Sequence, residues 1–324
     1  MDKHRESVER VNTALMVISC VAAFAAPFHL FLAAYAILGP LHYLTEISWL
    51  HDRDYFAPRR RPRRLWLGAV GVAIAVLLFG YITAAKPALE IGLVWLVFCT
   101  APLLLWVRHP VSGGALIFVI AFALLVFSDS RAYALLAYFL VTIVHVLLFT
   151  AAFVLYGALK GRSGSAIASL FVFAACVVAF FAVDVRPLVD ASESTLAMYR
   201  FFDPLNEQLM ALLGLSGARG ATAVMRLIAF AYTYHYLNWF SKTSVIKWHQ
   251  VSKPRAAAIM AMWLGAVALY ARDYESGLSL LYALSLLHVL LEFPLNHQTF
   301  AAIGGELTRG VKSWRRVRAS TSPA

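Results

Sequence analysis

Ten runs of mainly apolar residues divide the chain, and each approaches the length that crosses a bilayer. A transmembrane helix needs about 20 such residues. Backbone polar groups in a bilayer must bond within their own segment, so apolar runs of this length form helices. The runs cover residues 11–27, 28–50, 65–84, 88–107, 111–127, 132–158, 164–184, 222–241, 256–271 and 277–300. The sequence therefore predicts an all-α, polytopic transmembrane helical bundle of about ten spans, with residues 1–324 forming a single integral-membrane domain.

The composition excludes several other classes of protein. Hydrophobic residues make up 61% of the 324 residues, and charged residues make up only 14%. Soluble domains carry about 25% charged residues, so a conventional soluble enzyme and a disordered chain are both excluded. The three cysteines, Cys20, Cys99 and Cys176, lie far apart within apolar runs. A disulfide framework and a CxxC metal motif are therefore excluded as well.

The net charge of +11 follows the loops of this topology. With the N-terminus placed in the cytoplasm, 21 of the 28 lysines and arginines fall on the cytoplasmic side of the ten spans. Positive residues favour cytoplasmic loops, so we expect both termini to be cytoplasmic and no nucleic acid to bind. Residues 185–221 then form an extracytoplasmic loop, with a short interfacial helix at Asn206–Leu215. Residues 304–324 form a basic cytoplasmic tail.

Ionisable side chains inside the spans are few, and they follow a repeated pattern. His42 and Glu46 lie four residues apart in the second run, and His288 and Glu292 repeat this spacing in the last run. Residues four apart share one face of a helix. Each pair therefore presents an imidazole and a carboxylate to the same point of the bundle. Such groups are costly in a membrane, which makes them candidates for a functional site.

Two more histidines, His145 and His235, lie within the spans at 132–158 and 222–241. In the predicted topology, these two spans run from outside to inside, as do the spans that carry the repeated pairs. Four imidazoles and two carboxylates can thus meet in one layer. Nitrogen and oxygen ligands without thiolate favour iron, manganese or zinc. We predict a metal site, with Fe(II) preferred and Zn as the second choice, whose ligands are His42, His145, His235 and His288.

The remaining polar residues of these spans receive supporting roles. Glu46 and Glu292 are predicted to accept the free N–H of a ligating imidazole, each on a neighbouring helix, because metal-bound histidines usually need such a partner. Tyr234 and Asn238 are predicted to orient ligands or substrate. A plainer alternative treats a membrane histidine such as His145 as a helix-packing residue that bonds to a neighbouring helix.

These motifs resemble the Brp/Blh-like membrane β-carotene dioxygenases, the bacterial retinal-forming oxygenases. The resemblance is carried by GPLHYLTE at 39–46, by His145 and His235, and by SLLHVLLEF at 285–293, in the same order along the chain. It implies a non-haem iron held by four histidines. It also implies oxygen-dependent oxidation or cleavage of a lipid-soluble polyene, so that the partners are dioxygen, membrane lipids and a hydrophobic substrate from the bilayer.

Three positions depart from the pattern of that family. Glu46 stands where the family has aspartate, Tyr43 follows His42 where the family has glycine, and Leu287 replaces the proline before the late histidine. Glutamate can replace aspartate chemically, whereas a tyrosine beside a ligand reshapes the pocket. The departures therefore concern the carotenoid substrate more than the metal.

Two other functions remain open from the residues alone. In a zinc-dependent membrane hydrolase, three of the histidines would hold zinc and a glutamate would activate water. In a transporter coupled to protons or metal ions, the buried histidines and glutamates would serve as the coupling groups. The metal content of the purified protein separates the three: iron favours the oxygenase, zinc the hydrolase, and no metal the transporter.

The predicted orientation can be tested by cysteine labelling in intact cells after the native cysteines are replaced. Ala57→Cys should be protected from an impermeant thiol reagent, because it precedes the arginine-rich segment assigned to the cytoplasm. Ser192→Cys, in the loop assigned to the outside, should react. Reaction of both positions from outside would contradict the ten-span topology.

Overall fold

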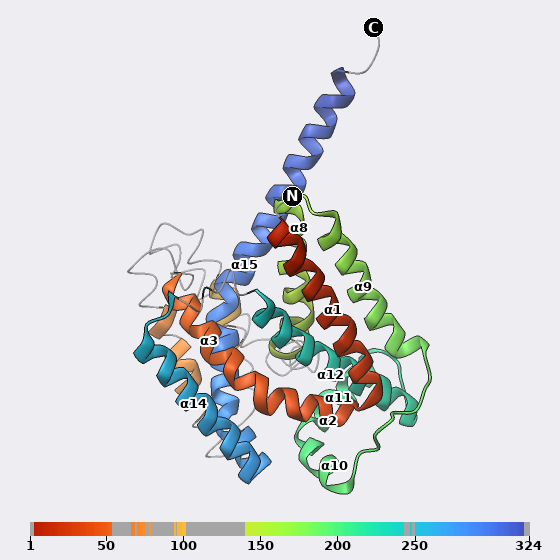
Figure 1. Ribbon diagram of the computed structural model, residues 1–324, viewed down its shortest axis with the longest axis vertical. Coiled ribbons are helices and arrows are strands. Elements are labelled where there is room, and N and C mark those ends of the chain that lie inside the picture. The colour runs from red at the N-terminus through yellow and green to blue at the C-terminus, as the bar shows by residue number, and fades with distance from the viewer. Residues whose placement is uncertain are drawn as a thin grey trace.

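The computed structural model describes residues 3–53, 66–68, 70–75, 78, 94, 96–101, 140–242, 247 and 250–320. Within these ranges the secondary structure is helical, and no strand occurs. The elements are α1 (Lys3–Ala25), α2 (Pro27–Ala33), η1 (Ala34–Leu38), α3 (Gly39–Asp52), η2 (Leu140–Phe149), α8 (Thr150–Gly161), α9 (Gly164–Ala182), α10 (Glu193–Tyr199), η3 (Arg200–Phe202), α11 (Asp203–Leu212), α12 (Gly217–Ser241), α14 (Lys253–Arg272) and α15 (Tyr274–Ser320). The helices pack into one bundle, from which the C-terminal end of α15 projects (Figure 1).

Six helical segments in the described part of the chain are long and apolar enough to cross a membrane. They are Ser7–Ala25, Pro27–Asp52, Thr142–Gly161, Gly164–Ala182, Lys253–Arg272 and Tyr274–Arg309. Each coincides with a predicted run, which confirms an all-α membrane helical bundle. The predicted run at 222–241 lies within α12. The predicted run at 111–127 lies outside the described residues, and those at 65–84 and 88–107 do so in large part.

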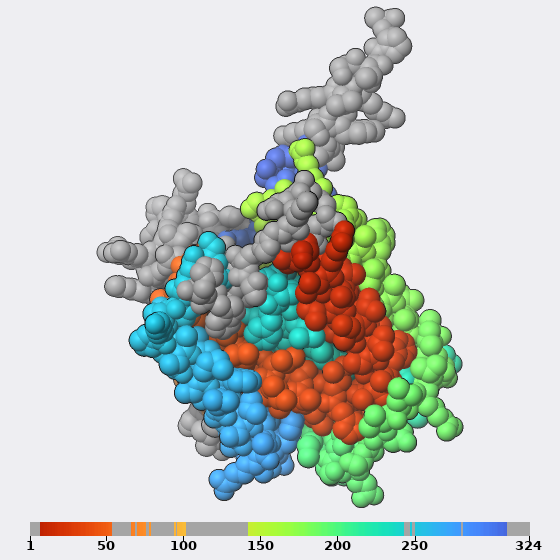
Figure 2. All heavy atoms as spheres, in the orientation of Figure 1, coloured from red at the N-terminus to blue at the C-terminus, as the bar shows by residue number. Residues whose placement is uncertain are grey.

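The helix α12 forms the centre of the bundle. Every side chain from Ala223 to Tyr236 is buried, whereas a helix at the surface of a bundle buries only one stripe. It packs against α1, α2, α9, α11 and η2. In Figure 2, part of α12 is visible between α1 and the other N-terminal helices. Side chains on different faces of α12 therefore meet different helices.

The first two predicted spans, at 11–27 and 28–50, are separated at Ala26. Ala26 has φ −148° and ψ 63°, which is not helical, and Pro27 begins α2. Proline suits the first turn of a helix because its missing N–H needs no partner there. From Pro27 the chain continues through α2, η1 and α3 without a loop.

Two segments, η1 and η2, are π-helical. A π-helix bonds each N–H to the carbonyl five residues earlier, so it takes more residues per turn than an α-helix. The segment η1 ends one residue before the GPLHYLTE motif, and η2 contains His145. Such segments are rare and frequently occur at functional sites.

The segment at 185–221 contains the predicted short helix in a shifted position. We predicted Asn206–Leu215, and the structure has α11 at Asp203–Leu212. The helix begins earlier because Pro204 occupies its first turn. Gly214 follows its end with φ 65°, a left-handed conformation that glycine adopts readily. Leu205 and Leu209 are buried, so this helix packs on the bundle.

The last helix is longer than the predicted span at 277–300. The helix α15 has 47 residues and contains Pro294. It includes most of the segment predicted as a basic tail, which is therefore helical up to Ser320. The cytoplasmic location of this tail stays a prediction.

A tight turn joins α14 and α15. Asp273 accepts a hydrogen bond from the backbone N–H of Ser276 at 2.9 Å, which caps the start of α15. Gly277 lies against Tyr270 of α14, and a Cβ atom at Gly277 would stand 2.7 Å from Cδ1 of that ring. The two helices can approach this closely only because residue 277 lacks a side chain.

Gly277→Ala should therefore destabilise the protein, because the added methyl group meets the Tyr270 ring and the neighbouring backbone. We expect a loss of about 1–3 kcal/mol, the usual cost of overpacking, seen as a lower midpoint of thermal unfolding in detergent. Gly265→Ala is the matched control, since nothing lies within 4 Å of a Cβ atom there. Equal stability of the two variants would contradict this account of the turn.

Candidate metal centre

The structure brings together the four histidines that the sequence singled out. They come from α3, η2, α12 and α15, and their side chains are only 1–7% exposed. The ring centroids of His42 and His235 are 4.7 Å apart, and those of His42 and His288 are 5.3 Å apart. The His145 ring lies 5.1 Å from that of His235 and 5.2 Å from that of His288. The four imidazoles thus form a closed ring of contacts, which we call the histidine layer.

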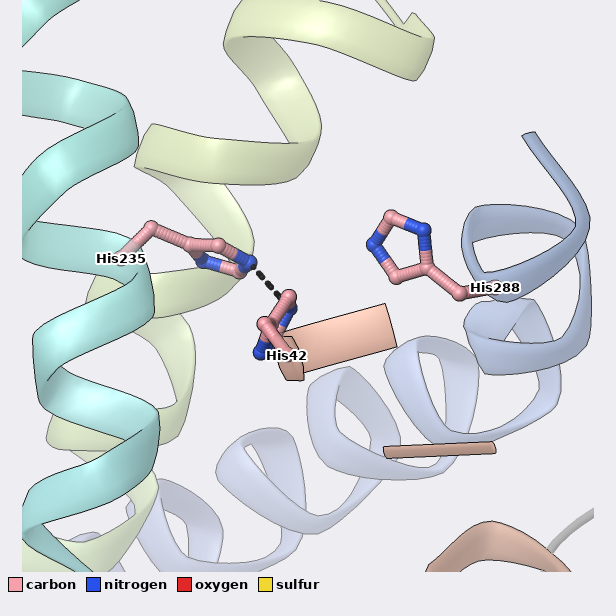
Figure 3. A group of neighbouring side chains, drawn as sticks. All are labelled: His42, His235 and His288. Carbon is pink, nitrogen blue, oxygen red and sulfur yellow. Dashed lines mark hydrogen bonds between the residues drawn. The ribbon is translucent and has the colours of Figure 1, made fainter. Parts of the chain in front are cut away.

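Three of these side chains form a triad that is close enough to hold a metal ion. His42, His235 and His288 each offer a nitrogen, and these atoms lie within 4.8 Å of one another. Figure 3 shows the rings turned toward a common point from three different helices. Nε2 of His235 and Nε2 of His42 are 3.0 Å apart. Two nitrogens bound to one metal at about 2.1 Å would be separated by roughly 3.0–3.4 Å, so this spacing suits a shared cation.

The carboxylate of Glu292 contacts a histidine on another helix. Its Oε2 lies 3.2 Å from Nδ1 of His145, and both side chains are 2% exposed. This contact matches the expectation that a glutamate serves a neighbouring helix. It turns Nδ1 of His145 toward the carboxylate and leaves Nε2 as the nitrogen available for a metal.

The other carboxylate behaves differently. Oε2 of Glu46 lies 3.0 Å from Nε2 of His42, one turn away on the same helix. The expectation of a partner on a neighbouring helix is therefore wrong for Glu46. The reason is local, because side chains four residues apart on a helix stand close enough to touch.

The polar atoms that lack partners fit a bound cation. Nδ1 of His42, Nε2 of His145 and both nitrogens of His288 are buried without a hydrogen bond. Oε2 of Glu46, Oε2 of Glu292 and Nδ1 of His145 make the close His–Glu contacts described above but no hydrogen bond. Buried polar groups are otherwise almost always paired. A dication would satisfy the free lone pairs of the imidazoles and offset the negative charge of the carboxylates. The donor set is nitrogen and oxygen, which iron and zinc both accept.

A threonine orients one ligand in a way that the sequence analysis missed. Oγ1 of Thr150 lies 2.8 Å from Nδ1 of His235. When Nδ1 carries the proton, the threonine oxygen accepts it and the Nε2 lone pair faces His42. Thr150 follows His145 by five residues, and this spacing places both residues near His235 because the π-helix η2 lies between them. No α-helical pattern would have found it.

A pair of tyrosines closes another side of the histidine layer. The Tyr43 ring stacks on that of His288, with centroids 4.2 Å apart. Its hydroxyl is 2.7 Å from that of Tyr236. A Cβ atom at Gly39 would stand 3.0 Å from the Tyr43 hydroxyl, so the motif glycine makes room for this tyrosine. The available signal was the departure at Tyr43 from the family pattern.

Tyr234 and Asn238 were both predicted to orient ligands or substrate, and the structure places them differently. Tyr234 bonds to Asn12 of α1 at 3.0 Å and packs against Phe173 of α9, so it connects α12 to α1 and α9. The structure does not bring it to the histidine layer, because it stands on a different face of α12 from His235. Asn238 lies one turn beyond His235, and its side-chain oxygen is buried without a hydrogen-bond partner.

Lys242 directly follows α12. Burial lowers the pKa of Lys242 to about 8, while the charge of Glu46 acts in the opposite direction.

Comparison of the chain with models of protein families, with curated proteins and with solved structures finds no match. Its function is therefore inferred from the site.

Glu46→Gln and Glu292→Gln test what the carboxylates do. If they only orient imidazoles, each amide keeps an acceptor oxygen, and metal affinity should fall by roughly 10- to 100-fold. Titration of the metal-free protein in detergent measures this affinity. Glu306→Gln should change nothing, because Glu306 lies on α15 well beyond Glu292 and pairs with Arg309. Complete loss of metal from either site variant would make that glutamate a direct ligand.

Proposed function

We propose that this protein is a membrane-embedded, metal-dependent oxygenase that uses non-haem Fe(II) and acts on a lipid-soluble substrate from the bilayer. The observation that carries the proposal is the histidine layer, in which four buried imidazoles and two buried carboxylates meet inside a membrane bundle. The two carboxylates stand beside the imidazoles, where they can accept or donate protons.

His42, His145, His235 and His288 would hold the metal. When bound, Fe(II) would supply the binding and activation of dioxygen. Thr150 forms a hydrogen bond with Nδ1 of His235, and Glu292 contacts Nδ1 of His145, so in each imidazole the opposite nitrogen is left for the metal. The burial of the site excludes water, and this protects reactive species from side reactions.

The resemblance to the Brp/Blh-like family supports a carotenoid or other polyene as the substrate class. The histidine layer contains the four histidines on which that resemblance rests: His42, His145, His235 and His288. Tyr43 and Glu46 depart from the family pattern, and both contact imidazoles of the layer. The pocket of this protein therefore differs from the family pattern where a substrate would approach the metal.

A zinc-dependent membrane hydrolase is the second candidate. The triad of His42, His235 and His288 supports it, because three histidines with an open position are a common catalytic zinc site. Glu46 stands beside the triad, where it can take a proton from water. The two candidates differ in the metal and in the need for dioxygen.

Replacement of any one ligand should empty the site while the protein still inserts. His42→Ala, His145→Ala, His235→Ala and His288→Ala should each lose bound metal, measured by elemental analysis of the purified protein. Wild type should hold stoichiometric iron and bleach a polyene such as β-carotene in micelles only when dioxygen is present. His51→Ala is the matched control, since His51 is an exposed histidine at the end of α3.

Two results would decide against the proposal. Full metal occupancy in the four variants would show that the histidine layer is not the metal site. Stoichiometric zinc with dioxygen-independent hydrolysis of an ester or amide in the bilayer would favour the second candidate.

A further inference from the structure

A small cavity lies among η1, η3, α12 and α15, and its walls are mostly aromatic. Its volume is about 40 Å³. The other described lining residues are two leucines, a threonine and a serine, and none of the described lining residues carries a formal charge at neutral pH. We call this space the aromatic cavity. Five rings line it: Tyr35, Phe201, Phe202, Tyr232 and Tyr282.

The inner side of the aromatic cavity adjoins the histidine layer. The centroid of the Tyr232 ring is 6.1 Å from that of Tyr236, and the Tyr236 ring is 5.1 Å from that of His42. A second connection runs through α15. Ser285 lines the cavity and forms a hydrogen bond with the hydroxyl of Tyr43, the residue whose ring stacks on His288. Only one layer of tyrosine rings therefore separates the cavity from the imidazoles.

The outer side of the aromatic cavity reaches the surface of the protein. The Tyr35 ring lies 5.8 Å from that of Tyr232 and 5.3 Å from that of Phe202. Phe202 in turn lies 5.4 Å from Phe201, whose ring is 6.1 Å from that of Tyr282. Phe201 is 38% exposed. A continuous row of rings thus runs from the surface to the histidine layer, and we call it the aromatic path.

The polar groups along the aromatic path need no ligand. Among the described residues that line the cavity, none has a buried side-chain nitrogen or oxygen without a partner. The hydroxyls of Tyr43 and Tyr236 pair with each other at 2.7 Å. A charged ligand would lose its water here without compensation. A conjugated apolar chain loses no hydrogen bonds and gains contacts with the faces and edges of the rings.

We propose that a wholly apolar polyene reaches the histidine layer along the aromatic path, with its end entering between Phe201 and Tyr282. A single water needs roughly 10–15 Å³, so the aromatic cavity admits a chain only when these two rings turn aside. Both can do so because Phe201 is exposed and Tyr282 is only half-buried. The proposal rests on the proposed function, and it names the route and the side chains that select the substrate.

Binding can be measured without turnover. β-Carotene is achiral, so it shows circular dichroism in the visible range only when a protein holds it in one twisted shape. The full-length protein in zwitterionic nanodiscs is titrated with β-carotene in the absence of dioxygen. We expect a visible dichroism band that saturates. Retinoate, a polyene with a carboxylate, should not displace the β-carotene, because its charge would be buried among the rings.

Two variants at the outer end of the aromatic path test the route. Phe201→Leu and Tyr282→Leu each remove a ring and keep an apolar side chain. Each should raise the dissociation constant for β-carotene roughly two- to ten-fold, through the loss of an aromatic contact. Phe171→Leu is the matched control and should leave it unchanged, since Phe171 is 72% exposed on α9 and lies outside the aromatic path.

A third variant closes the inner end. Ser285→Phe fills the aromatic cavity beside Tyr43, so the dichroism band should disappear. Its metal content should stay that of wild type, because Ser285 is not among the ligands of the histidine layer. This comparison separates a blocked route from a damaged metal centre, and the two surface variants test the route independently of it.

Four results would overturn the proposal: no saturable band, unchanged affinity in both surface variants, an undiminished band in Ser285→Phe, or displacement by retinoate as effective as that by unlabelled β-carotene. The titration is repeated after chelation of metal, and the band should persist. A protein that binds β-carotene along the aromatic path but holds no iron would reject the proposed function alone. Dioxygen-dependent bleaching that is unaffected by all three variants would reject the route alone.

Discussion

Two carboxyl groups, those of Glu46 and Glu292, are buried in a bundle whose outside is apolar, and much of the remaining architecture supplies their partners. An ionised carboxylate removed from water costs several kcal/mol unless it is paired. Each glutamate stands within 3.2 Å of an imidazole. Those imidazoles in turn contact other imidazoles, so the whole histidine layer is one coupled set of buried charges and dipoles.

This requirement explains why helices from distant parts of the chain must meet. His42 comes from the N-terminal third, His145 from the middle, and His288 from the C-terminal helix. The central helix α12 contributes His235 to the layer and Tyr234 to the contact with α1. A cation bound in the layer would thus join helices that are far apart in sequence. Metal binding and folding should then be linked in free energy.

Much of this organisation could be predicted from the sequence because it depends on simple periodicities. Apolar runs of bilayer length predicted the helices, and the repeated His–Glu spacing of four residues predicted which side chains share a face. The meeting of four histidines in one layer was expected from their positions in four spans that were assigned the same direction. The failures have a local cause. Glu46 contacts His42 on its own helix, because residues four apart stand close together. Tyr234 faces α1 instead of the histidine layer, because adjacent residues of a helix point about 100° apart. Thr150 could not be found, since its position depends on a π-helix that no α-helical pattern reveals.

The π-helical segments also restrict how the chain tolerates changes in length. Each residue of an α-helix turns the chain by about 100°, so an extra residue accommodated in η1 or η2 resets the orientation of everything that follows. Removal of one residue upstream of His42 would rotate GPLHYLTE away from the centre, yet the composition, the hydrophobicity and the motif would all be unchanged. Related chains could therefore retain the motif and lose the site. The register of η1 and η2, rather than the presence of the histidines, would distinguish the chains that keep the metal site.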